Sequence, residues 1–326
     1  FGALPFVFSG AIPSYLNAFF ETMSGFTTTG STILTDIEAM PPSLLLWRSL
    51  TQWLGGMGII VLSLAILPML GVGGMQLFKA EVPGPTADRL KPRIQDTAKL
   101  LWGVYVLLTG AEVILLMVGG MGFFDGINHA FTTMATGGFS TRNASVAAYD
   151  SAFIDWVITL FMFLAGVNFS LHYLALRGKL GDFIRNEEFL FFSGLAMLGT
   201  LLIALLNTGG TYADFFDNLR YSAFQVVSIL TTTGFGTADY ELWPVLCQYL
   251  LVFAMFIGGC AGSTGGGMKV ARILLLFKHA HVQIYRLIHP RAVRLVKLGD
   301  RPVAKDVMQS ILGFFAVYLG VFVAAS

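Results

Sequence analysis

"TTTGST" stands at residues 27–32, and two similar stretches follow it, "ATGGFST" at 135–141 and "TTTGFGT" at 231–237. Aligned on the glycine that precedes Ser or Phe, the three copies place Gly30, Gly138 and Gly234 in register. A Ser or Thr stands six positions before each of these glycines. A unit of roughly 100 residues therefore repeats, which predicts one supersecondary structure built three times.

The composition is that of a bilayer protein. Apolar residues make up 55% of the chain and charged residues only 12%, whereas a soluble domain carries about 25% charged residues. The net charge of +1 gives no reason to expect nucleic-acid binding. Cys247 and Cys260 lie in or beside one apolar stretch, so we expect two buried thiols rather than a disulfide framework. An integral membrane protein is predicted.

Apolar segments of about 20 residues are long enough to cross a bilayer as helices. Six such segments occur, at 44–70, 98–122, 152–176, 189–206, 242–277 and 307–326. Three stretches between them are too short or too polar to cross, at 13–26, 125–134 and 214–230, and each leads into a Thr/Gly turn. The pattern predicts an all-α polytopic membrane protein with three short re-entrant helices.

The distribution of Lys and Arg along the chain distinguishes the two sides of this protein. Of the 20 Lys and Arg residues, 17 fall in segments 79–99, 177–185 and 269–305, which the positive-inside tendency places in the cytoplasm. Only Arg48, Arg142 and Arg220 lie elsewhere. The Thr/Gly turns then open to the outside, where nearby acidic residues predict a face that attracts cations.

The chemistry of the turns favours an ion filter. Non-helical backbone at membrane depth is tolerated only where it is buried in protein or lines a wet cavity. Rings of carbonyl oxygens replace the hydration shell of K⁺, and glycine adopts the positive φ that turns successive carbonyls the same way. The alternative is that the turns only connect helices, but three copies in matching positions favour the filter.

Four stretches together carry a family resemblance: "FFETMSGFTTTGST" (19–32), "FTTMATGGFST" (131–141), "SILTTTGFGT" (228–237) and "GGCAGSTGGGMK" (258–269). The chain resembles the Trk/Ktr/HKT superfamily of cation transporters and, within it, the TrkH/TrkG-type potassium-translocating membrane subunits. The resemblance implies repeated helix–pore loop–helix units around a pseudo-fourfold cation pore. Compared with that pattern, the first helix and the fourth pore loop are expected to be missing.

The resemblance also implies the site and its partners. K⁺ is the expected transported ion, with no bound organic cofactor and no enzymatic activity. A homodimer in the bacterial cytoplasmic (inner) membrane is implied, together with a cytoplasmic nucleotide-binding regulatory subunit. Glycine rather than serine at position 30 favours K⁺ over Na⁺. The implied filter residues are Thr28, Thr29, Gly30, Thr136, Gly137, Gly138, Thr232, Thr233 and Gly234.

Six glycines within residues 258–267 predict a break in the middle of an apolar span, because each glycine disfavours a helix by roughly 1 kcal/mol. A phosphate-binding loop is excluded, since Met268 stands where that motif requires Lys. Close helix packing through small residues is one explanation. The resemblance implies instead a gate below the filter, formed by Gly258, Gly259, Gly262, Ser263, Thr264, Gly265, Gly266 and Gly267.

We therefore expect repeat 1 at 1–78, repeat 2 at 79–178, repeat 3 at 179–280, and a basic cytoplasmic loop with the first helix of repeat 4 at 281–326. The predicted function is potassium uptake, as a channel or a symporter. The alternatives are a Na⁺-permeable or non-selective relative, or a non-conducting membrane scaffold.

Overall fold

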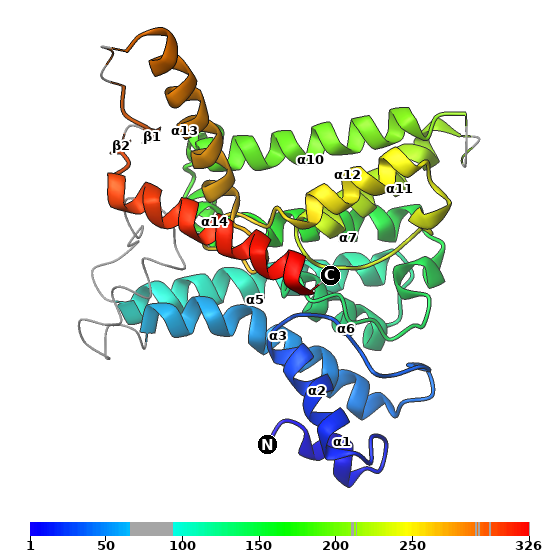
Figure 1. Cartoon of the computed structure of the whole chain (residues 1–326). Coiled ribbons are helices and arrows are strands. Elements are labelled where there is room, and N and C mark those ends of the chain that lie inside the picture. Colours follow the sequence, from blue (N-terminus) through cyan, green and yellow to red (C-terminus); the bar gives the residue numbers. More distant parts are fainter. Residues whose placement is uncertain are drawn as a thin grey trace.

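The computed structural model describes residues 1–65, 94–209, 212, 214–290, 292, 294–299 and 301–325. The regular secondary structure of the described residues is helical apart from one hairpin of two two-residue strands (Figure 1). Its elements are α1 (Leu4–Phe8), α2 (Tyr15–Phe26), α3 (Pro42–Ala65), α5 (Ile94–Val118), α6 (Phe123–Met134), η2 (Ser145–Tyr149), α7 (Ala152–Ala165), α8 (Phe169–Leu176), α9 (Gly181–Arg185), α10 (Glu187–Leu206), α11 (Phe215–Leu230), η3 (Tyr240–Leu242), α12 (Val245–Met255), α13 (Val270–Ile288), β1 (Lys297–Leu298), β2 (Arg301–Pro302) and α14 (Lys305–Ala325).

Long apolar helices account for the hydrophobic composition. Within the described residues, three are long and apolar enough to cross a membrane: Ala98–Val118 in α5, Glu187–Leu206 in α10 and Lys305–Ala325 in α14. They correspond to three of the segments expected from the sequence. The end of expected span 44–70, the boundary between residues 78 and 79, and most of basic segment 79–99 lie outside the described residues.

The expected span at 152–176 is not one continuous helix. Helices α7 and α8 meet at an angle of 102° across a three-residue break. The backbone at this break bonds to another segment, because the Gly166 carbonyl accepts a hydrogen bond from Cys260 N–H at 2.8 Å. Asn168 then starts α8 by accepting from Ser170 N–H at 2.8 Å. Contact with the glycine-rich segment therefore accompanies the bend in a stretch whose composition suits one straight helix.

The three re-entrant helices are confirmed as α2, α6 and α11, each followed by a non-helical turn and then a further helix. Asp214 caps α11 by accepting from the N–H groups of residues 216 and 217, as its position before the helix suggests. Asp125 lies in the first turn of α6, and the cap position belongs to Gly122. The sequence pore helix, turn and following helix thus recurs three times, and α5 and α10 precede it in the second and third units.

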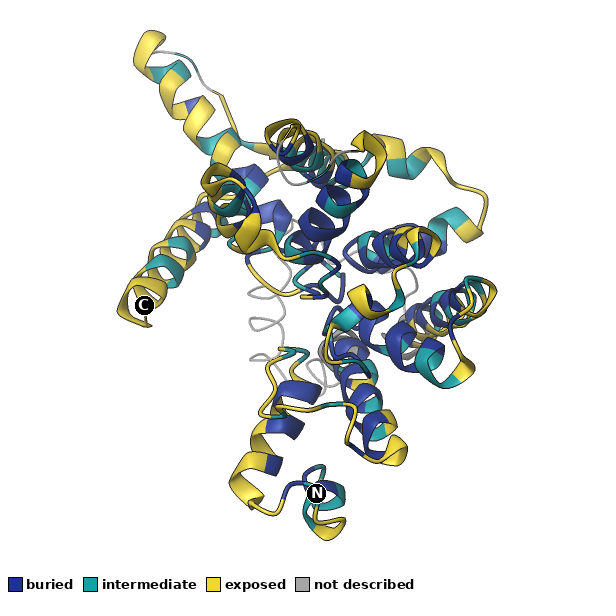
Figure 2. Ribbon diagram, turned by 90° about the vertical axis from the view of Figure 1, so that its right-hand side faces the viewer, coloured by how far each residue is buried: buried dark blue, intermediate teal, exposed yellow. Residues whose placement is uncertain are grey.

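The core lies where these units meet. Trp53 of α3 stacks on Tyr105 of α5 at 5.4 Å between ring centroids and contacts Phe131 of α6 at 5.0 Å. Buried residues gather toward the middle of the molecule, whereas α14 is mostly exposed (Figure 2). Apolar side chains on the outer helices also remain uncovered, with Leu205 71% exposed and Val317 66% exposed. Exposed apolar helix surface of this kind suits contact with lipid.

Two of the basic segments come together at one end of α10. Lys278 of α13 pairs with Glu187 at 2.5 Å, and Gly299 N–H donates to the same carboxylate at 2.9 Å. Helix α9, which ends in Arg185, directly precedes this point. The opposite end of α10 leads toward α11 and the third turn (Figure 1). Basic segments 177–185 and 269–305 therefore share one side, as the charge pattern predicts.

Candidate functional site: three Thr/Gly turns and a glycine-rich loop

The three re-entrant helices end in the same way. Thr28, Thr136 and Thr232 follow the last helical turn with φ of 55°, 52° and 61°, in the left-handed region. The next residue in each turn donates its N–H back to the helix, from Thr29 to Ser24 O at 3.0 Å and from Thr233 to Ser228 O at 2.8 Å.

Gly137 N–H makes the corresponding bond to Thr132 O at 2.9 Å. This is the Schellman arrangement, in which glycine normally occupies the left-handed position. A β-branched residue there is strained, so the surrounding structure must hold each threonine in place.

Two residues after each threonine, the aligned glycine also has positive φ. The values are 80° at Gly30, 72° at Gly138 and 84° at Gly234. The residue between them is not left-handed in any of the three turns. A residue outside the left-handed region thus separates two left-handed residues, and glycine adopts the second left-handed position without steric cost. One backbone path is therefore built three times.

The turns lie edge to edge. A Cβ built on Gly30 would come within 2.3 Å of the Gly137 carbonyl oxygen, and one built on Gly138 within 2.0 Å of the Thr233 carbonyl oxygen. In both cases the glycine faces the carbonyl of the residue that directly precedes the aligned glycine of the next turn. A Cβ on Gly234 would meet nothing within 4 Å in the described part of the chain. The order of the turns in space is first, second, third.

Hydroxyl groups brace the first and third turns from within. Thr27 Oγ1 donates to Met23 O at 2.7 Å and lies 2.8 Å from Thr29 Oγ1. Thr231 Oγ1 donates to Val227 O at 2.7 Å and lies 2.8 Å from Thr233 Oγ1. Because a hydroxyl carries one hydrogen, the second threonine of each pair must donate to the first. The turn is thereby tied to its own helix.

The second turn has Ala135 and Gly137 at these two positions and is braced from outside instead. Gln52 of α3 is fully buried and donates from Nε2 to the Gly137 carbonyl at 2.8 Å. Its Oε1 accepts from Phe139 N–H at 3.1 Å. The amide therefore holds the peptide groups on both sides of Gly138.

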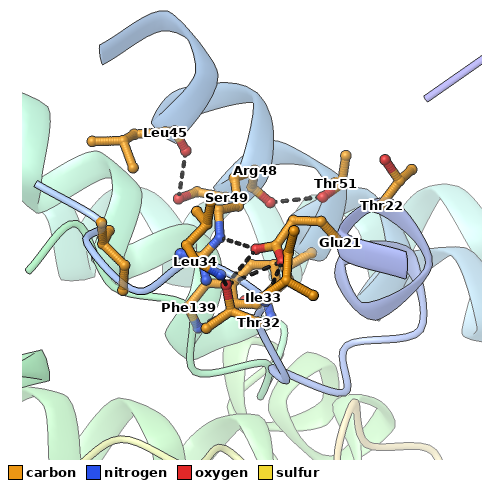
Figure 3. A network of polar contacts seen from close by, with 12 residues as sticks. Glu21, Thr22, Thr32, Ile33, Leu34, Leu45, Arg48, Ser49, Thr51 and Phe139 are labelled. Atoms are coloured by element: carbon orange, nitrogen blue, oxygen red, sulfur yellow. Dashed lines mark hydrogen bonds and ion pairs between the residues drawn. The ribbon is translucent and has the colours of Figure 1, made fainter. Parts of the chain in front are cut away.

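A buried ion pair stands behind the first turn. Arg48 Nε lies 2.6 Å from Glu21 Oε1, with both side chains almost fully buried. Glu21 also accepts from the Thr32 hydroxyl at 2.9 Å and from Ile33 N–H at 3.0 Å, so it fixes the chain that leaves the turn. The carboxylate is enclosed by donors from α3 and from the non-helical segment that leaves the turn (Figure 3).

The same arginine reaches the second turn. Arg48 Nη1 donates to Ser140 O at 3.1 Å, and its guanidinium lies 3.5 Å from the centre of the Phe139 ring. A cation in such a position is attracted to the ring face. Arg48 therefore links the segments that follow the first and second turns.

Arginine side chains also neutralise the charge of some acidic residues on the side of the protein that carries the Thr/Gly turns. Arg142 pairs with Asp125 at 2.7 Å, and Arg220 pairs with Asp217 at 3.0 Å and lies 3.6 Å from Asp155. Each of the three arginines outside the basic segments thus has an acidic partner on this side. The cation-attracting face expected from acidic residues is correspondingly weaker than their number suggests.

The loops that leave the first two turns are joined by Asn143. Its amide oxygen accepts from Ile37 N–H at 2.7 Å, and its amide nitrogen donates to Asp36 at 2.9 Å. This hydrogen bond, with smaller backbone contributions, lowers the pKa of the exposed Asp36 carboxyl below its usual value. Glu38 accepts from Asn143 N–H at 3.2 Å. The outer ends of the first two units are therefore tied together.

The predicted break in the span at 242–277 is confirmed, because α12 ends at Met255 and α13 begins at Val270. The loop between them contacts the second and third units. Thr264 Oγ1 lies 2.9 Å from the carbonyl oxygen of Met134, the last residue of α6. Gly266 N–H donates to the Thr232 hydroxyl at 2.7 Å. The loop thus meets the ends of two re-entrant helices.

Further contacts hold the ends of this loop. Gly258 N–H donates to Met268 O at 2.9 Å, which closes the loop on itself, and Lys269 Nζ donates to Gly265 O. Glu188, at the start of α10, accepts from Ala261 N–H at 2.6 Å. Cys260 and Cys247 are both free and buried, as expected.

The structure thus brings the nine expected filter residues into one row of turns and places the expected gate loop beside the third turn, where Gly266 bonds to Thr232. Sequence reasoning missed three side chains that support this arrangement: Gln52, Arg48 as the partner of Glu21, and Glu188. One signal was present, since the second turn lacks both hydroxyls found in the other two.

Comparison with known proteins gives a consistent result. A family model described as "TrkH: Cation transport protein" matches residues 2–326. The Trk system potassium uptake protein TrkH of Salmonella typhimurium strain LT2 is 47% identical over 331 residues, covering 99% of this chain and 68% of that protein. The protein TrkG of Escherichia coli strain K12 is 38% identical, with 94% of this chain and 63% of TrkG covered.

Among solved structures, that of the potassium transporter TrkH from Vibrio parahaemolyticus matches with a TM-score of 0.87 at 41% identity. The match covers 99% of this chain and 67% of the solved one, so the chain spans about two thirds of the length of its relatives. It therefore belongs to the TrkH family of cation transport proteins.

Proposed function

We propose that this protein takes up K⁺ across the bacterial cytoplasmic membrane through a filter formed by its Thr/Gly turns. One observation carries the proposal: three turns share left-handed φ at a threonine and at the glycine two residues later, and they lie edge to edge. Rigid backbone carbonyls arranged around a path are the ligands that replace K⁺ hydration. The relatives are named as potassium uptake proteins, which supports the same ion.

In this proposal the nine filter residues contribute carbonyl oxygens, with threonine hydroxyls as additional oxygen donors. The re-entrant helices point their C-terminal ends at the path, where the negative end of the helix dipole favours a cation. Repeats bounded at 1–78, 79–178 and 179–280 would each supply one turn. Residues 281–326 would supply the basic cytoplasmic loop and the first helix of a fourth repeat.

The glycine-rich loop is the proposed gate, formed by the eight residues named above. Its contacts with Thr232 and with the end of α6 support a position directly under the filter. The Gly258–Met268 bond joins the two ends of the loop, and in this proposal the segment between them moves when its contacts at Thr264 and Gly266 break.

Partner proteins follow from the same proposal. A homodimer, and a cytoplasmic nucleotide-binding subunit docked on basic segment 269–305, would supply the regulated motion. Helix α13 in this segment leaves Phe277, Ile284 and Leu287 exposed, which supports an apolar contact there.

The first test is K⁺ uptake by cells that lack their own uptake systems and express the full-length gene with its regulator. External K⁺ would be varied from micromolar to millimolar concentrations, with Na⁺ as competitor. Rescue at low K⁺ that Na⁺ does not block is expected. Failure of rescue with the protein confirmed in the membrane would favour a scaffold, and inhibition by Na⁺ would favour a less selective transporter.

The gate is tested separately by deleting residues 262–267. The deletion should raise K⁺ flux without changing the preference for K⁺ over Na⁺, because it removes the obstruction but leaves the filter turns. Unchanged flux in a correctly inserted protein would contradict the gating role.

A further inference from the structure

The second turn is built differently from the other two. The threonines three residues and one residue before the aligned glycine form a hydroxyl chain to the helix in turns one and three. At the same positions the second turn has Ala135 and Gly137, which carry no hydroxyl. Yet its backbone follows the same path, with φ of 52° at Thr136 and 72° at Gly138. A group other than threonine hydroxyls must therefore hold the backbone of the second turn in this conformation.

Gln52 occupies the space of the missing side chain. A Cβ built on Gly137 would lie 2.4 Å from Gln52 Cδ, 2.5 Å from its Oε1 and 2.7 Å from its Nε2. These are the three nearest atoms, so Gln52 is the first obstacle that a side chain at position 137 would meet. Gly137 has no positive φ, so its conformation does not itself require glycine. Glycine is needed at 137 because the glutamine is there.

The orientation of the amide is determined by its partners. The Gly137 carbonyl requires a donor and the Phe139 N–H requires an acceptor, so only one placement of Oε1 and Nε2 satisfies both. Through these two bonds Gln52 holds the peptide groups before and after Gly138, which limits rotation about both φ and ψ of that glycine. The hydroxyl chains of the other turns act only on residues before the glycine.

We propose that Gln52 is the positioning residue of the second filter turn, replacing the threonine hydroxyl pair, and that it thereby sets ion preference in this part of the filter. The inference rests on the proposed function, because ion preference has meaning only if the turns form a filter. It makes the second turn dependent on α3, the helix that follows the first turn, whereas turns one and three are braced by their own threonines.

The test uses the full-length protein with its regulator and two independent readouts. Gln52→Met keeps most of the side-chain volume but removes both hydrogen bonds, and should lower the K⁺ over Na⁺ preference by about tenfold. Ser49→Ala is the matched control, since Ser49 is buried in the same helix and its hydroxyl donates only to Leu45 O. Its ion preference should be unchanged.

The second readout is thermal unfolding in detergent of Gly137→Thr alone and combined with Gln52→Ala. The single variant should be strongly destabilised by the clash with Gln52. The double variant should melt at a higher temperature than the single variant, because threonine then fills the vacated space as it does in the other turns. This comparison does not depend on transport.

The outcomes separate the two proposals. If Gly137→Thr is equally destabilising with and without Gln52, the positioning role is overturned whatever the uptake result. If the melting pattern holds but the unmodified protein transports no K⁺, the filter function fails, and the role in ion preference fails with it. If uptake is normal and Gln52→Met keeps the preference of Ser49→Ala, the inference is overturned while the function stands.

Discussion

Replacement of Gly138 by alanine is the substitution that the geometry of the turns penalises most clearly. Alanine in the left-handed region costs about 1–2 kcal/mol, and the φ of Gly138 is 72°. The added Cβ would also lie 2.0 Å from the Thr233 carbonyl oxygen, whereas real Cβ atoms stay beyond 3.0 Å. The third turn must therefore recede by about 1 Å from the second.

The backbone cost alone lowers the population of the native turn by about 5- to 30-fold. We expect Gly138→Ala to reduce K⁺ uptake at least about tenfold and to allow Na⁺ to compete, because two neighbouring turns are displaced. Uptake would be measured in cells lacking other K⁺ systems, with the amount of protein in the membrane matched between variants.

Gly236→Ala is the control in the third turn. Gly236 has no positive φ, and the nearest atom to a built Cβ is 3.9 Å away. This variant should transport K⁺ within about twofold of the unmodified protein, as expected for a substitution without steric conflict. Equal uptake and equal ion preference in Gly138→Ala and Gly236→Ala would refute the reasoning, since the close approach of the turns would then have no functional effect.

Two further predictions concern the loop and the buried ion pair. Thr264→Val removes the hydroxyl that joins the glycine-rich loop to the Met134 carbonyl and should raise K⁺ flux about fivefold without changing ion preference, whereas Ser263→Ala, whose hydroxyl donates to Cys260 O within the loop, should not raise it. Equal flux in both variants would contradict a role for the Thr264 contact in holding the gate closed. Arg48→Met leaves the Glu21 carboxylate buried without a positive partner and should lower the free energy of unfolding by about 3–5 kcal/mol. The added change Glu21→Gln should recover stability in thermal melts. If the double variant melts no higher than Arg48→Met, the explanation through an unpaired buried charge is refuted.

Features that depend on local sequence were predictable. The re-entrant helices were recognised because three stretches that are too short or too polar to cross a bilayer each lead into a Thr/Gly turn. The break before Val270 was recognised because glycine is unfavourable inside a helix. These signals require no knowledge of which segments meet in space.

Features that depend on contacts between distant segments were not predictable in the same way. The 102° bend between α7 and α8 occurs in a sequence with the length and hydropathy of one span, where the Cys260 N–H bonds to the Gly166 carbonyl. Gln52 looks like an ordinary polar residue of a helix until the second turn is placed beside it. Asp125 resembles a helix cap, but its carboxylate is bonded to Thr141 and Arg142 instead.

The edge-to-edge contact of the turns has a consequence for biosynthesis. Gly30 packs against a carbonyl about a hundred residues later in the chain, and Gly138 against one that is nearly as distant. At synthesis rates of about 5–20 residues per second, the first turn waits roughly 5–20 s for its neighbour. During that interval the first turn, with its strained threonine, lies in the membrane without the neighbouring turn that packs against it. The conducting path is therefore expected to be completed late, by docking of units that are already inserted.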